Sequence, residues 1–102
     1  MAISALLLGD PQRITHVYGP QQMERLKALV SLHKEILTQG SLLAEIQAGL
    51  KPEVILSTWG MPRLTDEELD AMPQLKLVLY AAGDVRAFAD PIVARGIPLV
   101  SA

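Results

Sequence analysis

Cysteine is absent from the 102 residues, and charge of either sign is not in excess. Without cysteine the chain can form no disulfide framework, no thiolate metal site and no cysteine nucleophile. Nine Lys and Arg against eleven Asp and Glu give a net charge of −2, so the basic surface that binds nucleic acid is missing. The apolar runs are much shorter than the roughly 20 residues of a membrane span. We therefore expect a cytoplasmic protein that binds neither nucleic acid nor membrane.

Several enzyme motifs are also missing. The sequence contains no G-x-G-x-x-G, no Walker sequence and no G-x-S-x-G elbow. Its two histidines, His16 and His33, have no further ligands at the spacing of a metal site, so we interpret both as ordinary polar residues and predict no metal site. Asp10 follows the first apolar run and is interpreted as the start of a turn before Pro11 rather than as a catalytic acid.

Short apolar runs alternate with amphipathic stretches along the chain. The runs predict strands at residues 3–8, 30–33, 54–57, 75–82 and 97–101, and helices are predicted between the strands. Residues 9–20, rich in Gly and Pro, are predicted to form a loop. The clearest helix start is a capping box of Thr65 with Glu68, which explains the acidic run 66–68 without a catalytic role. Asp90 and Pro91 are predicted to open the last helix.

This alternation predicts an α/β fold, a flavodoxin-like, doubly wound, parallel five-stranded sheet with helices on both faces. The length allows one domain, residues 1–102. The run at 75–82 is the most apolar, and we expect it to form a central strand covered on both faces. Ligands of such sheets bind outside the carboxyl ends of the strands, which directs attention to the loops at 9–12, 57–61 and 82–86.

Two of these loops carry candidate binding residues. Trp59, the only tryptophan, follows the strand at 54–57 and could line an apolar pocket, or could cover the sheet end or a neighbouring domain. Gly83 follows the strand at 75–82 among small residues. Successive backbone N–H groups beside such a glycine can hold a carboxylate or another anion, although a tight strand-to-helix turn would use the same glycine.

Three segments resemble the amino-terminal part of the D-isomer-specific 2-hydroxyacid dehydrogenases. They are ILSTWGMPRLT at 55–65, LKLVLYAAGDVR at 75–86 and RGIPLVSA at 95–102. The likeness covers the whole chain in the order of its elements and is detailed from about residue 54. It implies a substrate-side domain that is truncated before the Rossmann domain, which in this family binds NAD or NADP and carries the catalytic Arg, Glu and His. No residue here matches those three, so the resemblance implies no catalytic and no cofactor-binding residue in this chain.

The resemblance implies an oxidoreductase as the parent protein and a binding role for this domain. The parent would transfer a hydride between NAD(P)H and a 2-oxo or 2-hydroxy acid, while the isolated chain would be inactive. Its partners would be the small anionic substrate and the missing Rossmann domain. The substrate-binding positions carried over by the resemblance are Trp59, Gly60, Ala82, Gly83, Asp84, Val85 and Arg86.

Asp84 departs from the family pattern, which more often has a small uncharged residue at this position. A carboxylate beside an anionic substrate is repelled by about 1 kcal/mol at 4 Å in water, and by more in a shielded site. Two alternatives follow: Asp84 turns outward toward Arg86, or the ligand is not a simple hydroxy acid.

Two other hypotheses stay open. The first is a stand-alone flavodoxin-like binding or signalling module, although a phosphoacceptor Asp after the third strand and a Lys after the fifth are missing, since Ser57-Thr58-Trp59 and Ser101-Ala102 stand there. The second is an interaction domain whose exposed apolar face binds another copy of itself. This hypothesis is compatible with the dehydrogenase fragment and predicts weak self-association.

Overall fold

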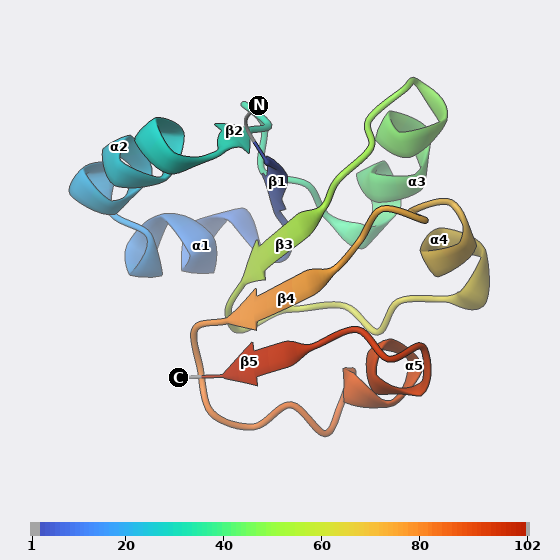
Figure 1. Ribbon diagram of the computed structural model, residues 1–102. Coiled ribbons are helices and arrows are strands. Elements are labelled where there is room, and N and C mark those ends of the chain that lie inside the picture. The colour runs from blue at the N-terminus through green and yellow to red at the C-terminus, as the bar shows by residue number, and fades with distance from the viewer. Residues whose placement is uncertain (1–2, 102) are drawn as a thin grey trace.

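A parallel sheet of five strands forms the centre of the computed structural model, which describes residues 3–101. The strands are β1 (Ser4–Leu7), β2 (Ser31–Leu32), β3 (Val54–Ser57), β4 (Leu77–Tyr80) and β5 (Leu99–Ser101). They lie in the order β2-β1-β3-β4-β5, and every neighbouring pair is parallel (Figure 1). This order is that of flavodoxin-like doubly wound sheets, so the predicted fold class is confirmed.

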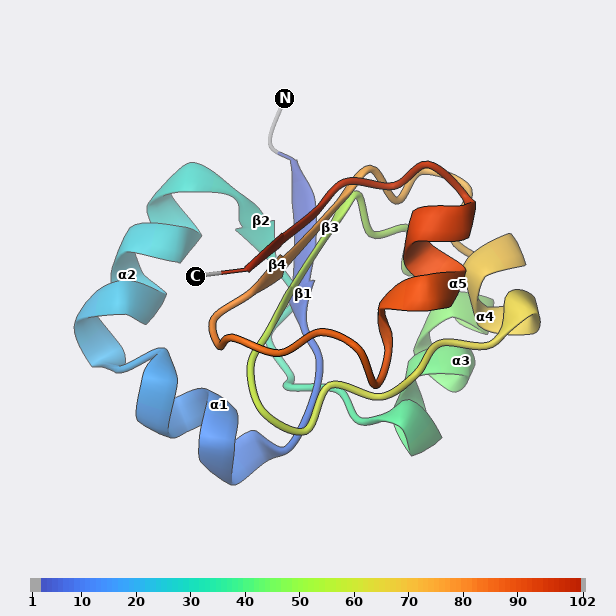
Figure 2. The same ribbon diagram turned by 90° about the horizontal axis from the view of Figure 1, so that it is seen from below.

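Helices cover both faces of the sheet. On one face lie α1 (Pro11–Val17) and α2 (Pro20–Leu29), and on the other lie α3 (Gln39–Gln47), α4 (Asp66–Asp70) and α5 (Ala89–Ala94) (Figure 2). Connections between parallel strands are right-handed. The chain crosses the sheet in one direction from β1 to β2 and in the opposite direction from β2 through β3 and β4 to β5. The helices of the first connection therefore lie on the opposite face from the helices of the later ones. Within residues 3–101, no helix combines the length and apolar character needed to cross a membrane.

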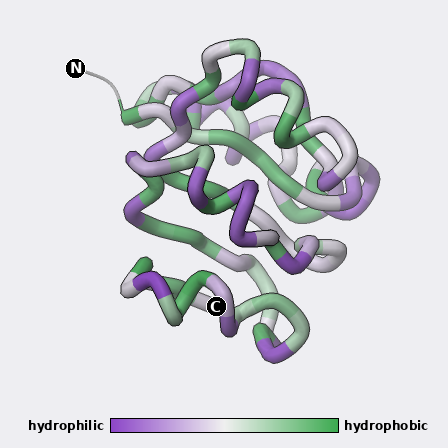
Figure 3. Tube along the Cα trace, turned by 90° about the vertical axis from the view of Figure 1, so that its right-hand side faces the viewer, coloured by the Kyte–Doolittle hydropathy of each residue, from purple (hydrophilic) through white to green (hydrophobic). Residues whose placement is uncertain are grey.

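The core has two parts because neighbouring residues of a strand point to opposite faces. Leu6 and Ile55 pack with Ile92 in the larger cluster, on the side of α3, α4 and α5. Leu7 and Leu56 pack with other residues in the smaller cluster, on the side of α1 and α2. Figure 3 shows hydrophobic stretches through the middle of the molecule and helices in which hydrophobic and hydrophilic residues alternate.

The predicted loop at residues 9–20 contains a helix, α1. Asp10 is its N-cap, and the Asp10 side chain accepts a hydrogen bond of 3.0 Å from the backbone N–H of Gln12. Pro11 takes the first helical position, where its missing N–H costs nothing. The Asx interpretation of Asp10 is therefore confirmed, while the loop prediction was wrong because the same Asp-Pro pair also starts a helix.

The two helix starts that the sequence predicts, for α4 and α5, show how local and tertiary signals differ. The capping box is confirmed: the Thr65 hydroxyl accepts from the Glu68 N–H at 3.1 Å, and the Glu68 carboxylate accepts from the Thr65 N–H at 2.8 Å. The predicted start at Asp90 was wrong, because α5 has Phe88 as its N-cap. The Phe88 ring is buried against Tyr80, with ring centroids 4.7 Å apart, so packing places the start earlier than the Asp-Pro pair does.

The fourth strand lies between two others, as predicted, but only one of its faces is fully covered. Val78 of β4 is buried against the larger cluster, but Leu79 on the opposite face is only half-buried. Val100 of the neighbouring β5 is 52% exposed. An apolar groove of about 240 Å³ remains there, lined by Tyr18, Leu26, Leu56, Leu79, Tyr80, Ala81 and Val100.

Candidate functional site

The two loops with candidate binding residues are joined at the carboxyl edge of the sheet. Ser57, the last residue of β3, pairs with Tyr80, the last residue of β4. Beyond the strands, the Ala81 N–H donates to the Ser57 carbonyl at 2.8 Å, and the buried Thr58 hydroxyl donates to the Ala81 carbonyl at 3.0 Å. These bonds hold the starts of both loops side by side, at the edge where ligands of this fold bind.

The loop after β4 presents backbone donors that the chain itself does not use. The N–H groups of Gly83, Asp84 and Val85 donate to no acceptor within residues 3–101. Gly83 does not have the positive φ that favours glycine, and a Cβ added to it meets no atom within 4 Å. Neither backbone conformation nor packing within the described part of the chain therefore requires glycine at position 83. Because glycine has no side chain, it adds no bulk beside the three N–H groups.

Asp84 is bound by Arg86, which is the outward-turned alternative expected above. The Arg86 side chain donates to both carboxylate oxygens, at 2.8 Å from Nη2 to Oδ2 and 3.0 Å from Nε to Oδ1, and the Arg86 backbone N–H donates to Oδ1 at 3.0 Å. The hydrogen bonds from the Arg86 side chain, followed by the one from its backbone, lower the pKa of Asp84 to about 2. Burial raises the pKa of the Tyr80 phenol, and the charge of Asp84 raises it further.

The loop after β3 is tightly packed against the loop after β1. Gly60 has a φ of +91°, and a Cβ at this position would lie 3.0 Å from the Asp10 Cβ and 3.2 Å from the Asp10 backbone nitrogen. Glycine is therefore required here by both conformation and space. Trp59, next to it, is 57% exposed, and the Arg13 guanidinium lies over its ring at 5.5 Å from the centroid, a cation–π contact.

A hollow of about 350 Å³ lies beside this tryptophan. It is lined by Asp10, Gln12, Arg13, His16, Val17 and Trp59. Residues of the loop at 82–86 are not among its lining, so the structure joins the two loops at the sheet edge without placing Trp59 and Gly83 in one pocket. Trp59 thus lines a hollow, but the other lining residues are mostly polar or charged, unlike the apolar pocket that was one interpretation of this tryptophan.

Arg13 is not singled out by the sequence pattern, and His16 is interpreted there as an ordinary polar residue. Both lie on α1, and their place in the hollow depends on that helix, which the sequence did not predict. One signal was available, since Asp10 and Arg13 stand three residues apart and form an ion pair of 3.8 Å between Oδ2 and Nε. That spacing has meaning only on a helix.

The structure defines a flavodoxin-like α/β domain whose loop after β4 has three backbone N–H groups without an acceptor in residues 3–101. No protein-family model matches the sequence, and no curated protein matches it significantly.

Proposed function

We propose that the chain is the substrate-side domain of an NAD(P)-dependent D-2-hydroxyacid dehydrogenase, and that it binds the carboxylate of a 2-oxo or 2-hydroxy acid. The observation that carries the proposal is the row of unused N–H donors at Gly83, Asp84 and Val85. Successive backbone N–H groups form a concave site for anions. Their position at the carboxyl edge of a parallel sheet agrees with the usual ligand site of this fold.

Electrostatics at the loop supports an anionic ligand. Asp84 alone would repel a carboxylate, but its two oxygens are already held by Arg86. The two opposite charges cancel at short range, so the open N–H groups dominate the local field. The low pKa of Asp84 keeps this pair charged throughout the neutral range.

The division of labour follows from the residues present. The loop after β4 binds and orients the carboxylate, and Trp59 forms a wall of the hollow beside the neighbouring loop. The nicotinamide cofactor supplies the hydride when bound, and its dinucleotide requires a glycine-rich strand-to-helix turn that these 102 residues lack. The redox step therefore belongs to a partner domain, and the chain alone is expected to turn over no NADH.

A titration of the ¹⁵N-labelled chain with pyruvate tests the binding role. Saturable shifts of the amide resonances of residues 83–85 are expected, with a Kd in the millimolar range because only one wall of the site is present. Acetone, which keeps the carbonyl and lacks the carboxylate, is the matched control and should leave these resonances unchanged. Equal shifts with both compounds, or shifts elsewhere only, would contradict the proposal.

A variant separates binding from folding. Gly83→Ala should weaken pyruvate binding severalfold while leaving the melting temperature within a few degrees, because its methyl group would have no atom of residues 3–101 within 4 Å. In the gene, the coding sequence after Ala102 is expected to continue into a G-x-G-x-x-G, followed by an Arg, a Glu and a His. A stop codon at that point would instead favour the stand-alone flavodoxin-like module.

A further inference from the structure

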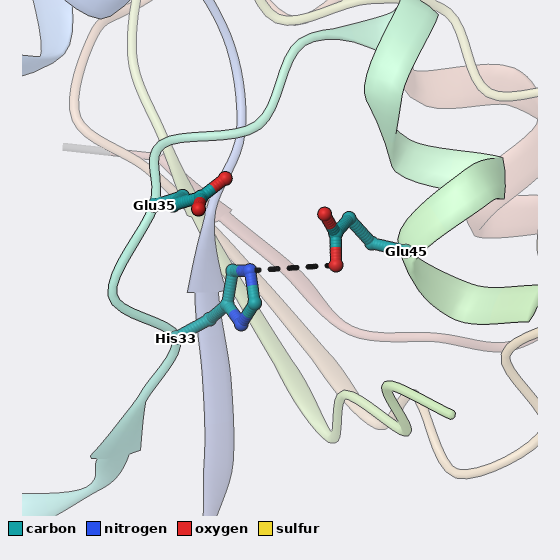
Figure 4. A group of neighbouring side chains, drawn as sticks. All are labelled: His33, Glu35 and Glu45. Carbon is teal, nitrogen blue, oxygen red and sulfur yellow. Dashed lines mark ion pairs between the residues drawn. The ribbon is translucent and has the colours of Figure 1, made fainter. Parts of the chain in front are cut away.

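A cluster of three metal-binding side chains lies between β2 and α3. His33 follows β2 directly, Glu35 lies two residues further on, and Glu45 projects from α3 (Figure 4). One ligand atom from each of them lies within 4.8 Å of the other two. None of the three belongs to the loops of the candidate substrate site.

The imidazole of His33 carries the unexplained feature of this cluster. Its Nε2 atom is buried and has no hydrogen-bond partner within residues 3–101. The nearest carboxylate oxygen, Oε2 of Glu45, is 4.0 Å away, which is too far for a hydrogen bond. A buried polar atom without a partner costs free energy, and a bound ion would supply the missing partner.

We propose that His33, Glu35 and Glu45 bind one divalent transition-metal ion of the zinc class. An imidazole nitrogen and two carboxylate oxygens are suitable ligands for zinc, at bond lengths of about 2.0–2.2 Å. Such bonds place neighbouring ligand atoms about 3.4 Å apart in a tetrahedron. The separation of 4.0 Å between Nε2 and Oε2 of Glu45 exceeds this distance by about half an ångström. The three ligand atoms lie within 4.8 Å of one another, so side-chain rotations that bring them up to about 1.4 Å closer would complete the site.

The chemistry and exposure of the ligands narrow the choice of ion. An imidazole ligand disfavours Mg²⁺ and Ca²⁺, which prefer oxygen alone. Glu35 is exposed and Glu45 is half-exposed, so an ion can enter from solvent and keep water at its remaining position. The bound ion would join the connection after β2, a strand of two residues, to α3 and so stabilise this edge of the sheet.

Isothermal titration of the tag-free chain with Zn²⁺, at neutral pH after chelator treatment, tests the site. One ion per chain is expected, together with a rise in melting temperature that EDTA reverses. His33→Gln and Glu45→Gln should each weaken binding about tenfold or more. His16→Gln, which removes the other histidine, is the matched control and should leave the affinity unchanged.

The wild-type chain provides a measurement that does not depend on whether the variants fold. Zn²⁺ should shift the side-chain resonances of His33 and the amide resonances of residues 33–35 and 45, while Mg²⁺ at the same concentration should not. The proposal is overturned if Zn²⁺ binds with no defined stoichiometry, if His16→Gln weakens binding as much as His33→Gln does, or if Mg²⁺ binds equally well.

Discussion

Alanine substitutions at three glycines separate backbone strain from steric contact in this fold. Gly60 has a φ of +91° and would place its Cβ 3.0 Å from the Asp10 side chain and 3.2 Å from the Asp10 backbone. Gly49 has a φ of +117°, and no atom of the described residues lies within 4 Å of an added Cβ, whereas Gly83 has neither a positive φ nor such a contact. Alanine at position 60 therefore tests backbone strain together with a steric contact, alanine at position 49 tests backbone strain alone, and alanine at position 83 tests neither.

The magnitudes follow from these geometries. A non-glycine residue at positive φ costs about 1–3 kcal/mol, and forcing a methyl group against a backbone atom adds about 1–3 kcal/mol. We expect Gly60→Ala to lose about 2–6 kcal/mol of unfolding free energy and Gly49→Ala about 1–3 kcal/mol. Gly83→Ala should be neutral, or more stable by up to about 1 kcal/mol, because alanine restricts the unfolded chain.

Urea denaturation and calorimetry of the three variants measure these losses. In a domain of this size 1 kcal/mol corresponds to about 4–8 °C in melting temperature, so Gly60→Ala should melt at least about 8 °C below the wild type. The key comparison is between the two strained positions. If Gly60→Ala is no less stable than Gly49→Ala, the close approach of the loops after β1 and β3 does not limit stability, and the reasoning fails.

Three further predictions concern single groups. Thr65→Ala should cost about 1 kcal/mol in urea denaturation, because the N–H of Glu68 loses its acceptor; an unchanged midpoint would show that the cap is redundant. The carboxyl group of Asp84, followed by the NMR resonance of its carboxyl carbon, should titrate with a pKa of about 2, and Arg86→Gln should return this pKa toward 3.8. Any stability from this pair is therefore present above pH 3.8 and is lost as the pH falls toward 2. An Asp84 pKa that the variant leaves unchanged would exclude the pairing in solution. Sedimentation velocity at high concentration should show weak self-association that Val100→Lys reduces, since Val100 is exposed beside the apolar groove; a strictly monomeric wild type would contradict this.

Strong local signals predicted the order of the elements, and weaker ones failed where packing competes with them. The capping box at Thr65 is entirely local, and it was predicted correctly. The start of α5 was not, because the burial of Phe88 against Tyr80 outweighs the preference of Asp90 for an N-cap position. Asp10 was correctly predicted to bond to the backbone after it, but the helix that follows buries only Ile14 and therefore shows no apolar periodicity.

The candidate sites likewise combine features that the sequence shows with features that depend on the tertiary fold. The small residues around Gly83 mark the proposed anion-binding loop in the sequence itself, because a glycine among small residues is recognisable without a fold. The sequence could not show that Gly83, Asp84 and Val85 leave their N–H groups unused, since this depends on where the loop's other bonds go. Arg13 beside Trp59 was likewise invisible, because the two residues are 46 positions apart in the sequence and meet only through the tertiary fold.

By itself, the amino-acid sequence determined the alternation of strands and helices, and with it a parallel doubly wound sheet, because hydrophobic periodicity and right-handed connections leave few other arrangements. It also determined which loops emerge at the carboxyl edge. Only the tertiary structure decided which side chains meet there, and that the Nε2 atom of His33 lies beside Glu45 without a hydrogen-bond partner in residues 3–101. Contacts of this kind join residues from separate elements, and their distances depend on packing rather than on local sequence preference.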